Sequence, residues 1–370
     1  MKLQVTVQNE MMKYIDEYRR KDLILGISEE IRKISKKEIS IMEVCGGHTM
    51  AIHRFGLQSL LPENIRLLSG PGCPVCVSGH HFIDTAIAYS KFPGIIITTY
   101  GDLIRVPGSI SSLEKEKAAG RDIRIVYSVL ESLEIARKNP GLKVIFLGIG
   151  FETTAPLTAA AIVEAKKSRI LNFFVLSAHK VMPPVMKALI MEGVKINGFI
   201  APGHVTAITG TDMYQDLPKI FGLGVVVSGF EPVDIMQSIL MLVAQIEAGK
   251  PKVQIQYQRV VKKKGNPVAR QLMNKVFMLE DDIWRGLGMI PLSGLKIRPG
   301  FSAFDAEKLI PLKVPIAPEP KGCICGLILR GLKTPLDCRL YAKKCTPSDP
   351  VGACMVSGEG TCATYFKYHS

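Results

Sequence analysis

The sequence predicts an α/β protein with two domains built on parallel sheets and a cysteine-rich C-terminal domain. Between about residues 40 and 230, short apolar runs alternate with stretches compatible with helices, and glycine-rich polar turns follow most runs. Largely continuous apolar runs of this kind are typical of parallel strands that are buried on both faces. At the other end of the chain, six of the nine cysteines fall between Cys323 and Cys362.

The apolar runs give the expected order of strands. Strands are expected at Ile39–Val44, Ile65–Leu68, Ile95–Thr99, Ile123–Tyr127, Val144–Leu147, Phe173–Leu176, Phe199–Ala201 and Val225–Val227. Helices that connect parallel strands are expected between Ser112 and Ala119 and between Ala159 and Lys167. We expect a first α/β domain at 1–145, a second at 146–250 and the C-terminal domain at 251–370.

Composition narrows the functional class. The chain of 370 residues carries a formal charge of +14, but its densest basic run is only Lys262–Lys264, and it has one tryptophan. This pattern does not favour nucleic-acid binding. No apolar stretch approaches the roughly 18 residues of a membrane span, and the first residues lack the apolar core of a secretion signal. We therefore expect a cytoplasmic protein with neither a nucleic-acid partner nor a membrane partner.

The C-terminal cysteines indicate a metal centre. An odd number of cysteines in a reducing compartment argues against a disulfide framework. The segment lacks the paired C-x-x-C knuckles of most zinc sites, and iron–sulfur ligation sets no fixed spacing. Four ligands from six cysteines would leave two as a redox-active pair. Zinc and inert or disulfide-bonded cysteines remain the alternatives. The six are Cys323, Cys325, Cys338, Cys345, Cys354 and Cys362.

Two glycine-rich turns carry the most specific chemistry. Cys45 and His48 flank two glycines and offer a thiolate and an imidazole, although a buried cysteine at a helix start would look similar. Cys73 and Cys76 form the one C-x-x-C of the chain, which favours dithiol–disulfide exchange, with half of a zinc knuckle as the alternative. Both turns follow expected strands, at the sheet edge where ligands bind.

Other polar residues after strands leave more than one interpretation open. His179 and His204 could face the cleft or be satisfied in the core. We expect His80 and His81 on a helix surface, although they could tune the C-x-x-C. Three acidic residues could serve as acids or bases, or as helix caps and supporting partners. They are Asp102, Glu152 and Glu231.

Together these motifs resemble the HypD family of hydrogenase-maturation proteins. The resemblance rests on CGGHT at 45–49, GPGCPVC at 70–76, GFETTAP at 150–156, SAHK at 177–180 and the cysteine-rich end. It covers nearly the whole chain. It implies two α/β domains and a C-terminal domain with a 4Fe–4S cluster. It also implies a scaffold with redox activity rather than a conventional turnover enzyme.

The resemblance further implies partners and residue roles. With a small HypC-type chaperone, the protein would carry the iron of the nickel–iron hydrogenase centre while cyanide, supplied by a HypE-type partner, and carbon monoxide are added. Cys45 would hold that transient iron together with a cysteine of HypC, and His48 would lie close by. Cys73 and Cys76 would form the dithiol relay. The cluster ligands would be Cys323, Cys338, Cys345 and Cys362, which leaves Cys325 and Cys354 as the spare pair.

Two other functions fit part of the pattern. An iron–sulfur-linked thiol–disulfide reductase acting on a protein substrate would use Cys73 and Cys76, but it leaves CGGHT without a role. A zinc-stabilised binding protein would account for the C-terminal cysteines alone.

Overall fold

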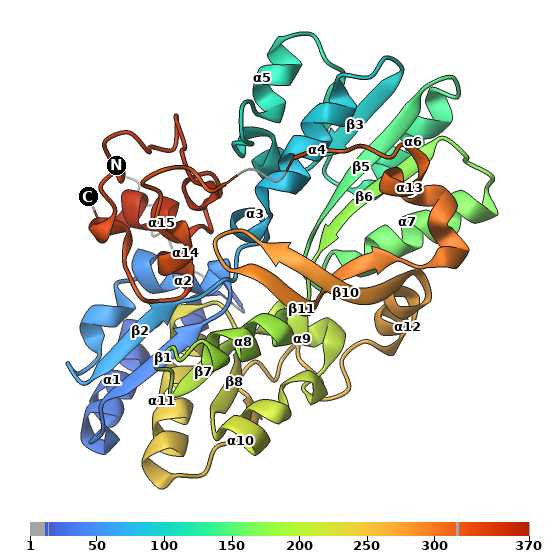
Figure 1. Ribbon diagram of the computed structural model, residues 1–370. Coiled ribbons are helices and arrows are strands. Elements are labelled where there is room, and N and C mark those ends of the chain that lie inside the picture. Colours follow the sequence, from blue (N-terminus) through green and yellow to red (C-terminus); the bar gives the residue numbers. More distant parts are fainter. Residues whose placement is uncertain (1–11, 14, 316–317, 370) are drawn as a thin grey trace, which may run out of the picture.

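The computed structural model describes residues 12–13, 15–315 and 318–369. The first residues, on which the expectation about a secretion signal rests, lie outside this part of the chain. Two parallel sheets form the body of the protein, and an antiparallel hairpin lies across their junction (Figure 1). The fold is therefore α/β, as predicted.

The first sheet has five parallel strands, which come from two separate segments of the chain. Its order is β2 (Ile65–Ser69), β1 (Ile39–Glu43), β7 (Gly198–Pro202), β8 (Gly224–Ser228) and β9 (Val253–Ile255). Helices α1 (Lys21–Ile34) and α11 (Pro232–Ala248) pack on one face. Helices α8 (Met182–Met191) and α10 (Asp216–Phe221) pack on the other. Because alternate residues of a strand point to opposite faces, Phe199 joins one core and Ile200 the other.

The second sheet has four parallel strands that come from one continuous segment. Its order is β4 (Ile123–Ile125), β3 (Ile95–Thr99), β5 (Lys143–Gly150) and β6 (Phe173–His179). Helices α6 (Val129–Lys138) and α7 (Ala155–Lys167) cover one face, and α4 (His80–Ser90) covers the other. Helix α5 (Leu113–Ala118) precedes β4.

All eight expected strands and both expected connecting helices are present. The division of the chain differs from a simple succession of domains. The segment between β2 and β7 builds the second sheet before the chain returns to complete the first. The boundary expected at residue 145 falls inside β5, and the expected second domain therefore contains strands of both sheets.

The hairpin joins the two halves. Helix α12 (Pro267–Val276) leads into β10 (Phe277–Trp284), which pairs with β11 (Gly288–Ile297). A bridge between Lys180 and Gly294 attaches the hairpin to the end of β6, and a bridge between Ser78 and Trp284 attaches it to the segment after the C-x-x-C.

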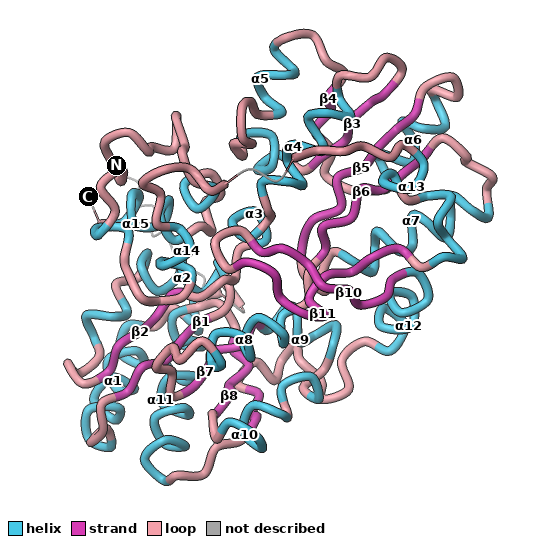
Figure 2. Tube along the Cα trace, in the orientation of Figure 1, coloured by secondary structure: helices cyan, strands magenta, loops and turns pink. Residues whose placement is uncertain are grey.

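Helix α13 (Ala306–Leu309) packs beside β6 of the second sheet. The C-terminal segment that follows, at 318–369, consists mainly of loops beside the first sheet (Figure 2). Its helices are α14 (Cys325–Leu329) and α15 (Thr361–Tyr368), and α15 packs against α2 (Gly46–Arg54). The remaining short helices are α3 (Pro74–Val77), α9 (Gly203–Thr209) and the 3-10 turns at Asp16–Tyr18, Leu57–Leu60, Gly101–Arg105, Asp212–Tyr214, Pro299–Phe304, Pro335–Asp337 and Ala353–Met355. Within the described ranges, none of the helices combines the length and hydropathy of a bilayer crossing.

Candidate functional site

Cys45 lies at the carboxyl end of an inner strand of the first sheet. It follows β1 and is the N-cap residue of α2, and β1 lies between β2 and β7. Its side chain is buried, with 3% of its surface exposed. The structure thus places Cys45 at the carboxyl edge of a parallel sheet, where the strand pattern predicted it.

Two glycines let neighbouring segments enclose Cys45. A Cβ atom on Gly72 would lie 2.1 Å from the backbone nitrogen of Cys45, so a larger residue cannot occupy this position without displacing the backbone. A Cβ atom on Gly46 would lie 2.5 Å from the Cβ atom of Glu359 in the C-terminal segment. Burial, followed by the nearby carboxylate of Glu359, raises the pKa of the Cys45 thiol above its ordinary value.

Glu43 fixes the backbone of this turn from inside the sheet. Its Oε2 accepts a hydrogen bond from the Cys45 N–H at 2.9 Å, and its Oε1 accepts one from the Thr49 hydroxyl. The carboxyl group is almost fully buried, and burial raises its pKa to about 8. Glu43 therefore holds both ends of the first turn of α2.

His48 is fixed beside an aromatic wall. Burial lowers its pKa to about 4, so the ring is neutral, and Nε2–H donates to the Gly229 carbonyl at 2.9 Å. Nδ1 is buried and has no hydrogen-bond partner among the described residues. The ring stacks on Phe230 at a centroid distance of 4.8 Å, and His204 lies on the same phenyl ring at 5.1 Å.

A cavity of about 420 Å³ opens above this turn. Its walls include Gly47, His204, Phe230 and Glu359. A Cβ atom on Gly47 would lie 3.6 Å from Cys45 Sγ and 3.3 Å from Phe230. Gly47, which has no side chain, therefore lies between the cavity and the buried thiol.

The C-x-x-C lies at the start of a short helix. Cys73 is the N-cap residue of α3, and its sulfur accepts a hydrogen bond from the Cys76 N–H at 3.3 Å. Both thiols are buried, with 3% of Cys73 and none of Cys76 exposed. Burial and the neighbouring thiols of Cys354 and Cys73 raise the pKa of Cys76.

Cys354 connects the C-x-x-C with the C-terminal cysteines. The thiol groups of Cys325, Cys362 and Cys76 lie beside its own thiol and lower the pKa of Cys354. Cys76 Sγ also lies 3.9 Å from the Ala353 carbonyl. A continuous series of thiols therefore runs from Cys73 to the C-terminal segment, which sequence spacing alone could not reveal.

Five other thiols surround one small apolar cavity. Gly352 lies between two of them, since a Cβ atom there would be 2.7 Å from Cys325 Sγ and 2.8 Å from Cys323 Sγ. Leu340, Met355 and Ile328 complete the wall. The five are Cys323, Cys325, Cys338, Cys345 and Cys362.

This donor set fits an iron–sulfur cluster in kind. All nine cysteines are free thiols, and the four expected ligands line the same cavity, whereas Cys354 does not. Soft thiolates in an apolar wall are the usual surroundings of such a cluster. In the described part of the chain, no three Cys, His, Asp or Glu side chains are arranged as metal ligands.

Several other residues singled out in the sequence are structural. His179 lies in the core, where its Nε2 bonds the Thr158 hydroxyl at 3.0 Å. Glu231 caps α11 and pairs with Arg19, and Asp102 accepts a hydrogen bond from Ser357 in the C-terminal segment at 2.8 Å.

His80 differs from its expectation. It was expected on the helix surface, but it is buried, with 6% of its surface exposed, because Glu319 and Arg285 pack against this end of α4. Its Nε2 donates to Glu319 at 2.9 Å, and its Nδ1 accepts from Arg285 at 2.6 Å.

Glu152 is the buried acid with unused hydrogen-bonding capacity. Its Oε1 accepts from the Met182 N–H at 3.0 Å, whereas Oε2 is buried without a partner in the described residues. Burial raises its pKa to about 7. It lines a cavity of about 680 Å³ whose walls also include Met213 and Phe277.

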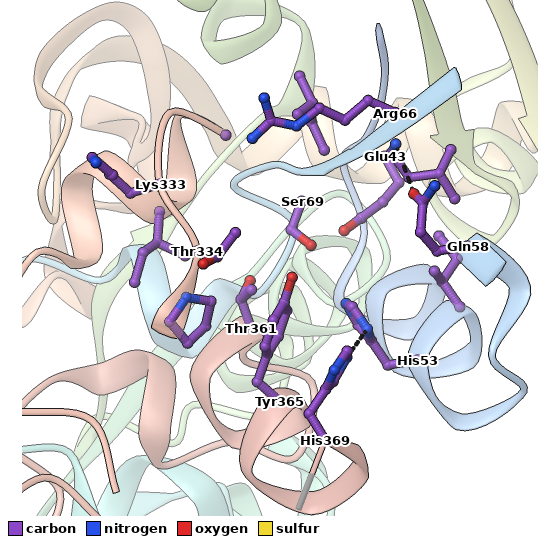
Figure 3. Close-up of a pocket in the computed structure, with 16 residues that line it drawn as sticks. Glu43, His53, Gln58, Arg66, Ser69, Lys333, Thr334, Thr361, Tyr365 and His369 are labelled. Atoms are coloured by element: carbon purple, nitrogen blue, oxygen red, sulfur yellow. Dashed lines mark hydrogen bonds between the residues drawn. The ribbon is translucent and has the colours of Figure 1, made fainter. Parts of the chain in front are cut away.

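The C-terminal helix closes onto the Cys45 turn from the other side. Residues of α15, α2 and β2 line a cavity of about 240 Å³ beside this contact. Figure 3 shows the hydroxyl groups of Ser69, Thr361 and Tyr365 directed toward the carboxyl group of Glu43. A hydrogen bond of 2.7 Å between His53 Nδ1 and His369 Nε2 bridges the two helices.

Comparison with known proteins identifies the family. The model of the HypD family, described as a hydrogenase formation family, matches residues 21–369. The chain belongs to the HypD family. The match includes both sheets, the C-x-x-C and all six C-terminal cysteines, so the family resemblance seen in the motifs is confirmed.

Curated relatives agree over their full lengths. The chain is 46% identical to hydrogenase maturation factor HypD of Rhizobium leguminosarum bv. viciae over 368 residues, with 96% of each chain covered. It is 45% identical to hydrogenase maturation factor HypD of Cupriavidus necator, with 96% of this chain and 97% of the relative covered. A putative hydrogenase expression/formation protein of Methanocaldococcus jannaschii is 45% identical, with 94% and 97% covered. The names of these relatives place the chain in a family of hydrogenase maturation factors.

Sequence reasoning missed three residues around these thiols. Glu43 gave a detectable signal, because it is the one charged residue of β1. Glu359 and Arg285 gave no local signal, since each reaches its thiol from a distant segment.

Proposed function

We propose that this protein is the scaffold on which the Fe(CN)2CO group of the nickel–iron hydrogenase centre is assembled. One observation carries the proposal. A separate buried thiol, Cys45, lies below an open cavity, while a continuous series of thiols leads away from Cys73 and Cys76 into a cysteine-lined C-terminal cavity. The arrangement provides one place to hold a metal and another to store and deliver electrons.

Cys45 would hold the cargo iron. A low-valent iron prefers a soft thiolate, and metal binding must displace the proton that burial retains on the Cys45 thiol. In the same turn, the unprotonated Nδ1 of His48 has no hydrogen-bond partner within the part of the chain that the structure describes. The opening beside Gly47 leaves room for the cysteine of a HypC-type chaperone to supply the second thiolate.

Cys323, Cys338, Cys345 and Cys362 would hold a 4Fe–4S cluster. Such a cluster supplies single electrons at low potential when bound. The apolar wall formed by Leu340 and Met355 would exclude water from it. This assignment is supported by the position of all four thiols on one cavity.

The remaining thiols would connect the two sites. Cys354 contacts Cys325 and Cys76, so the spare pair lies against the C-x-x-C. Reduction of a Cys73–Cys76 disulfide takes two electrons and two protons and gives two thiols. The dithiol would then provide reducing equivalents while cyanide from a HypE-type partner and carbon monoxide are attached to the iron.

The alternative, a thiol–disulfide reductase acting on a protein substrate, has less support. Such an enzyme would use Cys73 and Cys76, but it would leave the Cys45 turn and the cavity beside Gly47 without a role. We place the protein in the cytoplasm, where reducing conditions keep these thiols free.

Anaerobic purification with and without a HypC-type partner tests the proposal. The chain alone should carry about four irons and four sulfides, as expected for one cubane cluster. The complex should carry additional iron and show infrared bands of iron-bound cyanide and carbon monoxide. A colourless chain with stoichiometric zinc would rule out the cluster, and a complex without those bands would rule out the scaffold.

A further inference from the structure

A buried arginine occupies the contact between the two groups of thiols. Arg285 lies in the turn of the β10–β11 hairpin, and Figure 1 shows this turn directed toward α3 and α14. Its backbone N–H donates to the carbonyl of Val77, the residue that follows Cys76, at 2.9 Å. A Cβ atom on the next residue, Gly286, would lie 2.6 Å from the Cα atom of Gly326, which follows Cys325. Arg285 is thus fixed from both sides.

The guanidinium group of Arg285 is buried and only partly satisfied. The side chain is 2% exposed, and Nη2 donates to His80 Nδ1 at 2.6 Å and to the Pro107 carbonyl at 2.9 Å. Nε and Nη1 are buried and have no partner in the described ranges. An arginine used only as a clamp would not bring two unpaired donors into the interior, because each costs free energy there.

Among the described residues, no carboxylate forms an ion pair or a hydrogen bond with the guanidinium group of Arg285. Its hydrogen bond to His80 Nδ1 leaves His80 Nε2–H to donate to Glu319, so an imidazole ring separates the guanidinium group from that acid. The Glu319 side chain is 45% exposed, and water therefore weakens its field. Burial lowers the pKa of Arg285, whereas Glu319 and then the thiols of Cys325, Cys354 and Cys323 oppose that shift. The charge acts within electrostatic reach of three C-terminal sulfurs.

We propose that Arg285 sets the reduction potential of the C-terminal cysteine centre. The inference rests on the proposed cluster and concerns a positioning residue. Addition of one electron makes the centre one unit more negative, and a fixed positive charge in a buried site stabilises that reduced form. The Nε and Nη1 groups, which have no partner among the described residues, could donate hydrogen bonds to sulfur atoms of the centre. Such hydrogen bonds also stabilise the reduced form.

Redox titration of the anaerobically purified full chain tests this role. The reduced cluster is followed by electron paramagnetic resonance during addition of dithionite. Arg285→Met removes the charge and keeps an unbranched side chain. The midpoint potential of the cluster should therefore become more negative by at least about 59 mV, which is a tenfold change in the equilibrium constant for one electron. Arg285→Lys retains the charge and should remain close to the wild type.

Two further variants separate charge from structure. Arg330 donates to the carbonyls of Gly286 and Gly326 at the same contact but pairs with Glu192, so Arg330→Met should leave the midpoint unchanged. Glu319→Gln removes the partial counter-charge at a half-exposed position and should move the midpoint in the positive direction. Structural damage does not produce shifts of opposite sign in these variants.

The outcomes are distinct. Equal shifts in Arg285→Met and Arg285→Lys, or no shift in Arg285→Met, would overturn the role of Arg285. If Arg285→Met loses its iron, Glu319→Gln decides: a positive shift supports the role, and an unchanged or more negative midpoint overturns it. A wild-type chain without a reducible cluster would overturn the proposed function and this inference together.

Discussion

Cys45 lies alone at the end of a buried strand, whereas the six C-terminal cysteines lie on loops and short helices between Cys323 and Cys362. The surroundings of Cys45 are set by sheet pairing, by Glu43 and by Gly72, which a larger residue could replace only by displacing the backbone. The C-terminal thiols are held largely by one another and by a small apolar wall.

This difference predicts how far each site would depend on a bound metal. A turn that the fold has already shaped needs no metal to keep its geometry. A loop segment that buries few apolar residues gains much of its stability from the ion it binds. We therefore expect metal loss to leave the Cys45 turn intact and to loosen the C-terminal segment.

The largest effect is expected from the loss of a C-terminal cysteine. Cys338→Ala should lose most of the iron, because it removes one of four proposed ligands, and should expose the C-terminal segment to proteolysis. Cys325→Ala is the matched control, since Cys325 lines the same cavity but belongs to the proposed spare pair. Iron analysis and limited proteolysis measure both effects. Equal iron loss in the two variants would contradict the division of roles.

The next prediction concerns Cys45 itself. Cys45→Ala should retain the C-terminal cluster and the fold, because one small thiol contributes little to core packing. In a complex with the HypC-type partner, it should abolish the infrared bands of iron-bound cyanide and carbon monoxide. Cys45→Ser should behave in the same way, because a hydroxyl is a hard ligand. Bands at full strength in either variant would show that iron is held elsewhere.

Backbone packing around Cys45 gives a third test. Gly72→Ala should destabilise the protein by about 3 kcal/mol or more, because its Cβ atom would lie 2.1 Å from the Cys45 nitrogen and the backbone must shift. Gly26→Ala in α1 is the control, since nothing lies within 4 Å of its Cβ position, and it should stabilise by about 0.5–1 kcal/mol. Chemical unfolding measures both. A mild Gly72→Ala effect would mean that the turn is less rigid than the comparison requires.

The same contrast explains what the sequence could predict. The eight strands were predictable because a parallel strand buried on both faces needs a continuous apolar run, as in β3. The pairing of β1 with β7 was not predictable, because the segment that forms the whole second sheet lies between Ile41 and its partner Gly198 in the sequence. The β10–β11 hairpin was missed because β10 carries three consecutive acids, Glu280, Asp281 and Asp282, and has few buried positions.

The candidate site was predictable in its motifs and not in its contacts. Local patterns marked Cys45, Cys73 and Cys76, because a thiol beside glycines after a strand is a local feature. The contact of Cys76 with Cys354 joins residues almost three hundred positions apart, and no spacing rule contains it. The burial of His80 likewise depends on distant Glu319. Tertiary packing supplies this information.

The buried carboxyl group of Glu152 should make the stability of the folded chain depend on pH. Glu152 has a pKa of about 7 in the fold and an ordinary value of 4.5, because burial disfavours its charged form. As pH rises from 4.5 to about 7, the unfolded chain releases this proton before the folded chain does. The folded state therefore loses stability over that range, by at most about 1.4 kcal/mol per pH unit.

Glu152→Gln should remove this loss, because a glutamine has no proton to release. Its stability relative to the wild type should increase from pH 5 to pH 7 and then level off. The ring centroids of the single tryptophan, Trp284, and of Phe151 lie 5.9 Å apart. The fluorescence of Trp284 therefore reports urea unfolding close to the substituted residue. Glu63→Gln, at an exposed position, should retain the pH dependence of the wild type. Parallel curves for Glu152→Gln and the wild type would show that the buried carboxyl group does not limit the stability of this region.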